Sequence, residues 1–259
     1  MLIDAQDLNL VIGDKNIVEN ASVRIPEGRI VGLIGPNGAG KTSLLKMLAN
    51  VQTASSGHYY FAGKAIEQYP EKTLAREIGY LAQDATAHWP LRVQKLIELG
   101  RLPWQGYGKK LGKSDRQTID HACDITEVRH LLDRVATTLS GGEKTRVFLA
   151  RLFAAEPRVI FADEPIAALD PYHQLHVMEI LQQHARNGGT VLVVMHDINM
   201  ASRFCDELIL INHGKILKTG TISDLLADNL LADTYGIELK MFCDGDAYSI
   251  VPWQRIHSP

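Results

Sequence analysis

The chain is organised around Gly35-Pro36-Asn37-Gly38-Ala39-Gly40-Lys41-Thr42, which matches G-x-x-x-x-G-K-[ST], the pattern of a phosphate-binding loop. Before it, Ile30–Ile34 is an apolar run without alternation, which predicts a buried parallel strand. After it, Ser43–Ala49 contains neither Gly nor Pro and favours a helix. A strand, a glycine turn and a helix direct backbone N–H groups and the positive end of the helix dipole at one point. This context predicts a nucleotide site rather than a glycine-rich turn that matches by accident.

An acid pair downstream of the loop predicts that the nucleotide is hydrolysed. In the loop, Lys41 is placed to reach the β- and γ-phosphates, and the Thr42 hydroxyl to ligate Mg²⁺. The apolar strand Val159–Ala162 ends in Asp163 and Glu164. In a phosphate-loop fold this strand runs beside the loop, so Asp163 is expected near Mg²⁺ and Glu164 where a carboxylate polarises the attacking water. Acids after a strand are common at helix starts, so the pair indicates a hydrolytic site only in combination with the phosphate-binding loop upstream.

The composition indicates an ordinary globular protein of 259 residues, with 46% hydrophobic and 22% charged residues. The net charge of −3 gives no electrostatic reason to expect nucleic acid as a partner. The three cysteines lie far apart and form no CxxC pair, which indicates a reducing compartment without a zinc site or disulfide framework. No apolar run reaches the ~18 residues that cross a bilayer, and the first residues lack the features of a signal peptide. We expect a soluble chain, which leaves room for a membrane-embedded partner.

The order of strands and helices predicts an α/β fold, a phosphate-loop NTPase core with a mostly parallel sheet. Short alternating runs before residue 30 predict an N-terminal antiparallel β subdomain. Helical periodicity from Asp84 to about Ala155 predicts an inserted helical subdomain, interrupted by a glycine-containing loop at 104–110. Strands that alternate with helices after it predict a parallel sheet. The expected regions are 1–83 (β subdomain and first part of the core), 84–155 (helical insert), 156–235 (second part of the core) and 236–259 (a small β appendage with a frayed end).

A second specific signal is Leu139-Ser140-Gly141-Gly142-Glu143. Ser140 and Glu143 have the spacing of a capping box, which predicts that a helix starts here and continues through Leu152. Capping alone does not explain Gly141 and Gly142, because glycines weaken a first helical turn. They do expose N–H groups that a second phosphate could approach. Two phosphate-binding helix starts in one chain suggest a composite site shared between two subunits.

In this order the motifs resemble those of the ATP-binding-cassette ATPases, the nucleotide-binding subunits of ABC transporters, and the resemblance covers nearly the whole chain. Walker A corresponds to Gly35–Thr42 and Walker B to Val159–Glu164. The Q-loop glutamine corresponds to Gln83, the signature to Leu139–Glu143, the D-loop to Ala168-Leu169-Asp170 and the switch histidine to His196.

The resemblance implies that two such subunits face head to tail and enclose two ATP molecules with Mg²⁺. Lys41 and the neighbouring loop amides would hold the phosphates, and Ser140 and Gly142 would contact the γ-phosphate of the other subunit's ATP. Glu164 would act as the base. The full set of implied site residues is Ile12, Gly35, Pro36, Asn37, Gly38, Ala39, Gly40, Lys41, Thr42 and Ser43 for ATP; Thr42, Gln83 and Asp163 for Mg²⁺; Gln83, Glu164, Asp170 and His196 for catalysis; and Ser140, Gly141, Gly142 and Glu143 for the contact in trans.

Three positions depart from the family pattern. The aromatic residue that stacks on adenine is replaced by Ile12, which stands next to Gly13. This change implies weaker stacking and a looser preference for ATP over GTP. The usual Gln after the signature is Thr145, which puts one helix-start contact in doubt. Walker A ends in Lys41-Thr42-Ser43 where many members have Lys-Ser-Thr, a swap that keeps the hydroxyl ligand.

The segment after Gln83 resembles importer subunits for iron–siderophore, haem and cobalamin complexes. The relevant stretches are His88–Val93 and Leu99–Pro103. The resemblance implies a subunit that energises uptake of a metal–chelate type substrate through transmembrane permease subunits, on the cytoplasmic face of the membrane, with a substrate-binding protein as an indirect partner. Trp89 fits either a partner contact or packing between two helices.

Three alternative functions are compatible with parts of this pattern. A soluble ABC ATPase would act on ribosomes, DNA or iron–sulfur assembly, but members of those classes usually carry two cassettes or long coiled coils, and this sequence shows neither. A nucleotide-binding regulator without turnover is disfavoured because both Glu164 and His196 are present. An importer subunit for a different cargo stays open, since cargo is chosen by subunits other than this one.

Overall fold

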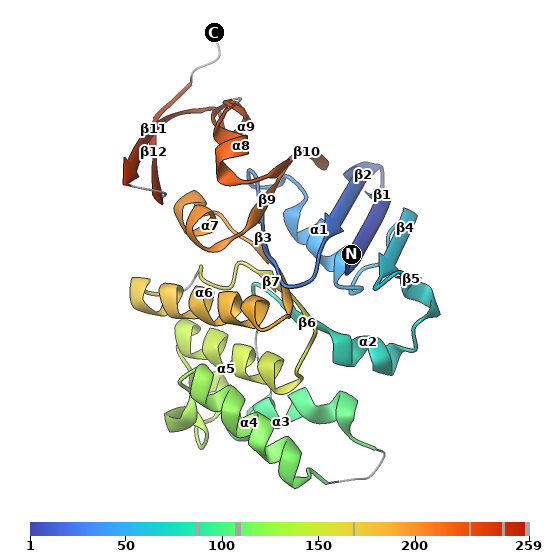
Figure 1. Ribbon diagram of the computed structural model, residues 1–259. Coiled ribbons are helices and arrows are strands. Elements are labelled where there is room, and N and C mark those ends of the chain that lie inside the picture. Colours follow the sequence, from blue (N-terminus) through green and yellow to red (C-terminus); the bar gives the residue numbers. More distant parts are fainter. Residues whose placement is uncertain are drawn as a thin grey trace. The chain divides into compact units, whose positions relative to one another are not determined.

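The structure is a computed structural model that describes residues 1–85, 87, 89–106, 110–167, 169–227, 229–244 and 247–256. These residues form two compact units, of which the first comprises Met1–Ile66 and Leu192–Pro259, and the second comprises Glu67–Val191 (Figure 1). Parts of three predicted features lie outside the described residues: His88, Ala168 of the D-loop, and Tyr107–Lys109 of the 104–110 loop. The final His257–Pro259 lie outside them as well.

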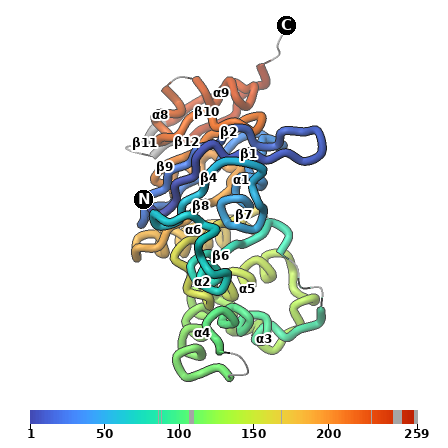
Figure 2. Tube along the Cα trace, turned by 90° about the vertical axis from the view of Figure 1, so that its right-hand side faces the viewer, coloured from blue at the N-terminus to red at the C-terminus, as the bar shows by residue number. Residues whose placement is uncertain are grey.

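An antiparallel sheet forms the start of the first unit, in the order β2-β1-β4-β5. Figure 2 shows β2, β1 and β4 of this sheet. Its strands are β1 (Ile3–Ile12), β2 (Lys15–Ile25), β4 (Ser56–Phe61) and β5 (Lys64–Ala65). Ile3, Ala5 and Leu8 of β1 are buried, while Asp7 of the same strand is exposed. Such a pattern fits a sheet with one face on the core. The antiparallel pairing of β1 with β2 is what the alternating runs before residue 30 predicted.

Parallel pairing in the first unit joins β3 (Ile30–Ile34) to β9 (Glu207–Asn212), with Val31 opposite Glu207. Strand β10 (Lys215–Gly220) pairs with β9 in the antiparallel sense. It was not predicted, since an exposed strand that carries lysines lacks an apolar signal. The unit also contains α1 (Lys41–Leu48), α7 (Ile198–Phe204), α8 (Ile222–Ala227), α9 (Leu230–Tyr235) and the hairpin β11 (Ile237–Asp244) with β12 (Ala247–Arg255).

The second unit pairs β6 (Ile78–Leu81) in parallel with β7 (Val159–Asp163). Its helices are α2 (Glu71–Glu77), α3 (Val93–Glu98), α4 (Lys113–Ile125), α5 (Gly141–Ala154) and α6 (Pro171–Arg186). Short 3₁₀ turns lie at η2 (Leu99–Trp104), η3 (Arg129–Leu131) and η4 (Ala136–Thr138), and η1 (Ile66–Gln68) and β8 (Thr190–Val194) span the limits between the units. The helical faces predicted from periodicity are buried: Val93, Leu96, Ile97 and Gly100, and Ile119, Ala122, Cys123 and Thr126.

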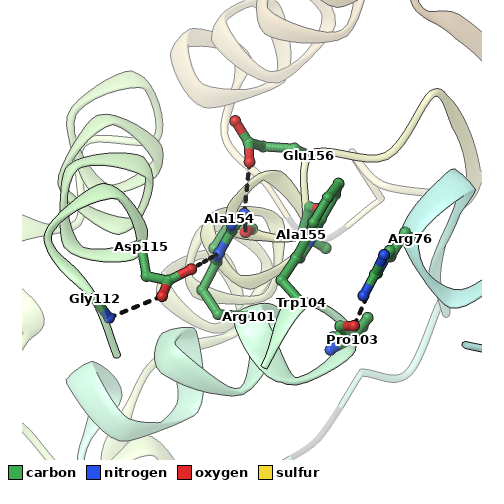
Figure 3. A network of polar contacts seen from close by, with 9 residues as sticks. All are labelled: Arg76, Arg101, Pro103, Trp104, Gly112, Asp115, Ala154, Ala155 and Glu156. Carbon is green, nitrogen blue, oxygen red and sulfur yellow. Dashed lines mark hydrogen bonds and ion pairs between the residues drawn. The ribbon is translucent and has the colours of Figure 1, made fainter. Parts of the chain in front are cut away.

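Arg101 joins three segments of the second unit (Figure 3). Its side chain is 6% exposed. Its Nε donates to Asp115 of α4 at 2.9 Å, and its Nη1 donates to the Ala154 carbonyl at 3.0 Å and to Glu156 at 2.6 Å. The guanidinium also lies 5.1 Å from the ring centroid of Trp104. These contacts fix η2 to the start of α4 and to the end of α5.

The predicted fold class is confirmed, because parallel strand pairs alternate with helices and an antiparallel β subdomain precedes them. The fully buried strands β3, β7 and β8 are those that the uninterrupted apolar runs predicted. Within the described part of the chain, no helix has both the length and the apolar character that a membrane span requires.

Candidate nucleotide-binding site

The phosphate loop occupies the turn between β3, which ends at Ile34, and α1, which begins at Lys41. Gly35, Gly38 and Gly40 have positive φ angles of 152°, 77° and 99°. A Cβ on Gly35 would lie 2.0 Å from the Ile211 carbonyl oxygen, and one on Gly40 would lie 2.7 Å from that of Ile17. Glycine is therefore required at these two positions by both the backbone conformation and the close approach of neighbouring strands.

The loop fits a polyphosphate ligand. A Cβ on Gly38 would meet no protein atom within 4 Å, so the space beside this residue is open. The Lys41 ammonium lies at the loop, where it donates to the carbonyls of Gly35 and Pro36 at 2.8 and 2.9 Å. A lysine that is 6% exposed thus holds its positive charge at the N-terminus of α1. Charge, glycine backbone and helix dipole together suit phosphate oxygens.

The turn between β9 and β10 supports this loop from outside. The Gly214 N–H donates to the Ala39 carbonyl at 2.9 Å, and the Gly214 carbonyl accepts from the Glu19 N–H at 2.8 Å. This contact was not predicted, although Asn212-His213-Gly214 has the composition of a tight turn. Gly214 links the loop to β2 by backbone bonds alone.

The remaining predicted residues of the first unit lie on three elements. Thr42 and Ser43 are in the first turn of α1 and half-buried. Ile12 ends β1 next to the Gly13 turn, with 54% of its surface exposed. His196 is exposed and follows β8. The next residue, Asp197, caps α7 by accepting from the N–H groups of Asn199 and Met200 at 2.8 and 3.0 Å.

In the second unit, the structure brings Gln83 and Glu164 together. The Gln83 Nε2 donates to Glu164 Oε2 at 2.7 Å. Asp163 ends β7 with 1% of its surface exposed, and Glu164 follows with a φ of 48°. A non-glycine residue in this left-handed region is uncommon and concentrates at functional sites. A buried carboxylate, a strained glutamate and a glutamine amide therefore lie at the end of one strand.

Tyr80 is a neighbour of this cluster that was not predicted. Burial and, to a smaller extent, the negative charge of Asp163 raise the pKa of its phenol to about 12. The phenol is therefore neutral at physiological pH. The sequence gives no signal for it, because a tyrosine in a short strand is ordinary core composition.

The signature residues start a helix, as predicted. Ser140 caps α5, and its Oγ accepts from the Glu143 N–H at 3.3 Å, while Glu143 Oε2 accepts from the Ser140 N–H at 2.7 Å. The Ser140 N–H, followed by the Arg134 charge, holds the pKa of Glu143 below its usual range. Gly141 and Gly142 are the first helical residues. Thr145, which stands in place of the usual Gln, donates from its Oγ1 to the Gly141 carbonyl of the same helix at 3.2 Å.

Asp170 caps α6 and is held by His173 on both oxygens. The His173 N–H donates to Oδ1 at 3.0 Å, and Nδ1 lies 2.8 Å from Oδ2. The backbone N–H of His173 is the main cause that keeps the pKa of Asp170 below its ordinary value. The predicted site residues thus fall into two groups: Ile12, Gly35–Ser43 and His196 belong to the first unit, and Gln83, Ser140–Glu143, Asp163, Glu164 and Asp170 belong to the second.

An open groove of about 910 Å³ lies elsewhere in the second unit. Leu91, Leu99 and Leu102 contribute apolar surface, and Glu98, Arg116 and Asp120 contribute charge. Trp89 precedes the groove residues in the chain, and 75% of its surface is exposed. Packing of Trp89 between two helices, one of the two interpretations of the sequence, is therefore wrong.

Comparison with known proteins places these motifs in one family. The family model described as "ABC transporter" matches residues 18–167, which is more than half of the chain. The chain belongs to the ABC transporter family. The ferric enterobactin transport ATP-binding protein FepC of Escherichia coli is 36% identical over 92% of this chain and 89% of its own. The hemin import ATP-binding protein HmuV of Photobacterium profundum is 36% identical over 90% of this chain and 84% of its own length.

A solved structure described as an inward-facing conformation of a putative metal-chelate type ABC transporter has the same fold. Its TM-score is 0.82 at 23% identity, and the match covers 97% of both chains. The resemblance that the motifs indicated is confirmed. As a member of this family, the chain is an ATP-binding ABC protein and an ATPase.

Proposed function

We propose that this chain hydrolyses ATP to drive uptake of a metal–chelate type substrate, as one of a pair of ATP-binding subunits beneath a membrane permease. The observation that carries the catalytic part is the Gln83–Glu164 contact at the end of β7, beside buried Asp163. Residues of these types serve metal binding, water positioning and general base catalysis in phosphoryl transfer.

In the proposed mechanism, the loop amides and Lys41 bind the phosphates and stabilise the charge that develops during transfer. Thr42, Asp163 and Gln83 would hold Mg²⁺, a hard cation that takes oxygen ligands from a few side chains and from the phosphates themselves. Bound there, Mg²⁺ would neutralise phosphate charge. Glu164 accepts the proton of the attacking water, and Gln83 orients its carboxylate through the 2.7 Å contact. His196 is assigned to the γ-phosphate.

The helix start at Ser140 supports action as a dimer. Its capping box satisfies the N–H of Glu143, and Gly141 and Gly142 leave the first turn without side chains. We assign this helix start to the ATP that the partner subunit holds. Asp170, fixed by His173, belongs to the same proposed interface.

The groove of the second unit supports a permease partner. It combines leucines with charges of both signs, a composition that suits an amphipathic helix. Trp89 is exposed in the chain segment that leads into it, and exposed tryptophans are enriched at protein interfaces. We assign the groove to a cytoplasmic helix of the permease, which places the chain on the cytoplasmic face of the membrane.

The cargo class rests on the relatives. The two named above serve ferric enterobactin transport and hemin import, so iron chelates are the substrates proposed for the complex. Within such a complex, a separate binding protein would deliver the substrate. A soluble ABC ATPase that acts on a macromolecular complex is the competing function.

The Glu164→Gln variant tests the catalytic proposal. It keeps the size of the side chain and its contact with Gln83 but removes the base, so it should bind ATP, lose most hydrolysis and accumulate as an ATP-bound dimer. Light scattering after size exclusion with and without ATP measures the dimer, and phosphate release measures turnover. Normal turnover would show that Glu164 is not the base.

A further inference from the structure

His196, which we assign to the γ-phosphate, lies just before helix α7. The helix has seven residues, Ile198–Phe204, and begins two residues after His196. Asp197 satisfies the first N–H groups, those of Asn199 and Met200. A helix this short is marginal by itself, so its direction must come from packing and from bonds to its neighbours.

Asn199 supplies such bonds through its side chain. Its Nδ2 donates to the Ile250 carbonyl at 3.0 Å, and its Oδ1 accepts from the Ile250 N–H at 2.7 Å. The amide thus pairs with both backbone groups of one residue in β12, as a neighbouring strand would. Ile250 is 1% exposed and pairs with Met241 of β11. The first turn of α7 is therefore fixed to the C-terminal hairpin.

The same C-terminal segment approaches the phosphate loop. Tyr235, the last residue of α9, precedes β11 by one glycine. Burial raises the pKa of its phenol to about 12, and the Gly35 N–H acts on it in the opposite direction. Gly35 is the first residue of the phosphate loop. The C-terminal segment thus has one residue, Tyr235, near the start of the phosphate loop and another, Ile250, bonded to α7.

We infer that Asn199 is a positioning residue for ATP hydrolysis: by pairing with Ile250 it fixes the first turn of α7 to β12 and so sets the place of His196. The inference rests on the proposed role of His196. It makes the hairpin β11–β12 part of the catalytic machinery rather than an appendage. An apolar side chain at 199 would leave the N–H and the carbonyl of buried Ile250 without these partners, so only a side chain with both a donor and an acceptor holds α7 to β12 in this way.

The geometry explains why the effect should fall on turnover. Phosphoryl transfer depends on positioning, and a displacement of about 1 Å can cost roughly 100-fold in rate. Binding of ATP depends chiefly on the phosphate loop, whereas the side chain of Asn199 bonds to Ile250 of β12. Loss of the pairing should therefore lower kcat and leave KM for ATP nearly unchanged.

The test compares four variants of the full chain with the unaltered protein. Asn199→Ala removes both bonds to Ile250. Asn199→Asp keeps the shape and the acceptor but sets a carboxylate against the Ile250 carbonyl. Ser202→Ala is the matched control, because its Oγ donates to the Asn199 carbonyl within α7, at 2.9 Å, and not to β12 among the bonds of the described residues. His196→Ala removes the residue through which Asn199 is inferred to act. Steady-state hydrolysis, ATP affinity and thermal unfolding are measured for each.

We expect kcat to fall roughly tenfold or more for both Asn199 variants, with KM within about twofold of its starting value. Ser202→Ala should keep both constants. In the His196→Ala background, Asn199→Ala should have no further effect, because residues that act as a unit are not additive. An unchanged kcat in the Asn199 variants, or an equal further loss in the double variant, would overturn the inference.

The outcome also separates this inference from the role of His196. If His196→Ala itself hydrolyses ATP normally, the proposed role of His196 fails, and the positioning role fails with it. If His196→Ala is inactive while Asn199→Ala is fully active, only the positioning role fails. If Asn199→Ala loses ATP binding and unfolds at a much lower temperature than Ser202→Ala, the contact is structural and the inference is wrong.

Discussion

The phosphate loop and the Gln83–Glu164 pair are held in place by different means. Backbone fixes the loop: strands β9 and β2 leave no room for a Cβ at Gly35 and Gly40, and Gly214 bonds to the loop through its backbone N–H. A side-chain hydrogen bond of 2.7 Å joins Gln83 to Glu164. A binding loop gains from rigidity, whereas residues that act on water during turnover must be free to change partners. Substitutions in the loop should therefore lower ATP binding and stability, whereas substitutions in the Gln83–Glu164 pair should lower turnover.

The largest effect on hydrolysis is expected from a change at the helix start that we assign to the partner subunit's ATP. Ser140→Arg places a long cation at the helix start proposed to serve the partner's ATP, so hydrolysis should stop while the monomer still binds ATP. Binding measured by fluorescence titration and turnover measured by phosphate release separate the two properties. Loss of ATP binding by the monomer would contradict the composite site.

A methyl group at Gly35 should damage the fold as well as binding. Its Cβ would lie 2.0 Å from the Ile211 carbonyl, and the left-handed φ adds roughly 1–2 kcal/mol of strain for an L-residue. We expect Gly35→Ala to lose ATP binding and to be less stable by about 3 kcal/mol. In Gly38→Ala the new methyl group meets no protein atom within 4 Å, so only the backbone strain should lower the stability of this variant. Equal stability of the two variants in urea unfolding would contradict the close approach of β9.

Breaking the Arg101 network should destabilise the second unit. Removing one partner of a buried ion pair costs about 3 kcal/mol, so Arg101→Met should lose that much at pH 7. Arg129→Met, which breaks an exposed pair with Asp124, should lose much less stability than Arg101→Met. Urea unfolding of the two variants measures the difference.

The same network predicts a pH dependence. The Gly112 N–H and then the Arg101 guanidinium lower the pKa of Asp115. A lowered pKa in the folded state stabilises the protein above the unfolded value, near 3.9, and this contribution disappears as the pH falls through the folded pKa. The gap in stability between Arg101→Met and the unaltered chain should therefore narrow below about pH 4. A gap that widens with acid would exclude this pairing.

The smallest effect is expected at Ile12, which is 54% exposed at the end of β1. An aromatic ring there should add about 0.5–1.5 kcal/mol of stacking on a nucleotide base. Ile12→Tyr should therefore sharpen the preference for ATP over GTP by less than about tenfold in competition binding. If the unaltered chain already discriminates between ATP and GTP as well as Ile12→Tyr does, Ile12 does not contact the nucleotide base.

The sequence predicted the core strands and the capped helix start at Ser140 well because their patterns are local. Ile30–Ile34 is a strand with the predicted bounds, and Ser140 caps a helix through the predicted box. Predictions failed where tertiary contacts decide. The exposed strand β10 has no apolar signal, and the pairing of Asn199 with Ile250 joins positions 51 residues apart.

Spatial neighbours of the site escaped prediction for the same reason. Gly214 and Tyr80 are ordinary residues in a turn and a strand, and only the fold brings them to the phosphate loop and to Asp163. The exposure of Trp89 likewise depends on how the second unit packs.

The central claim, an ATPase that works beneath a permease, is tested most directly by purifying the tagged Glu164→Gln protein with ATP from its native cells in a gentle detergent. Mass spectrometry then identifies its companions. We predict a polytopic membrane protein that is lost when Trp89→Arg is added while ATP binding persists. Recovery with ribosomes, with DNA or with no companion would contradict the transporter and leave only the ATPase.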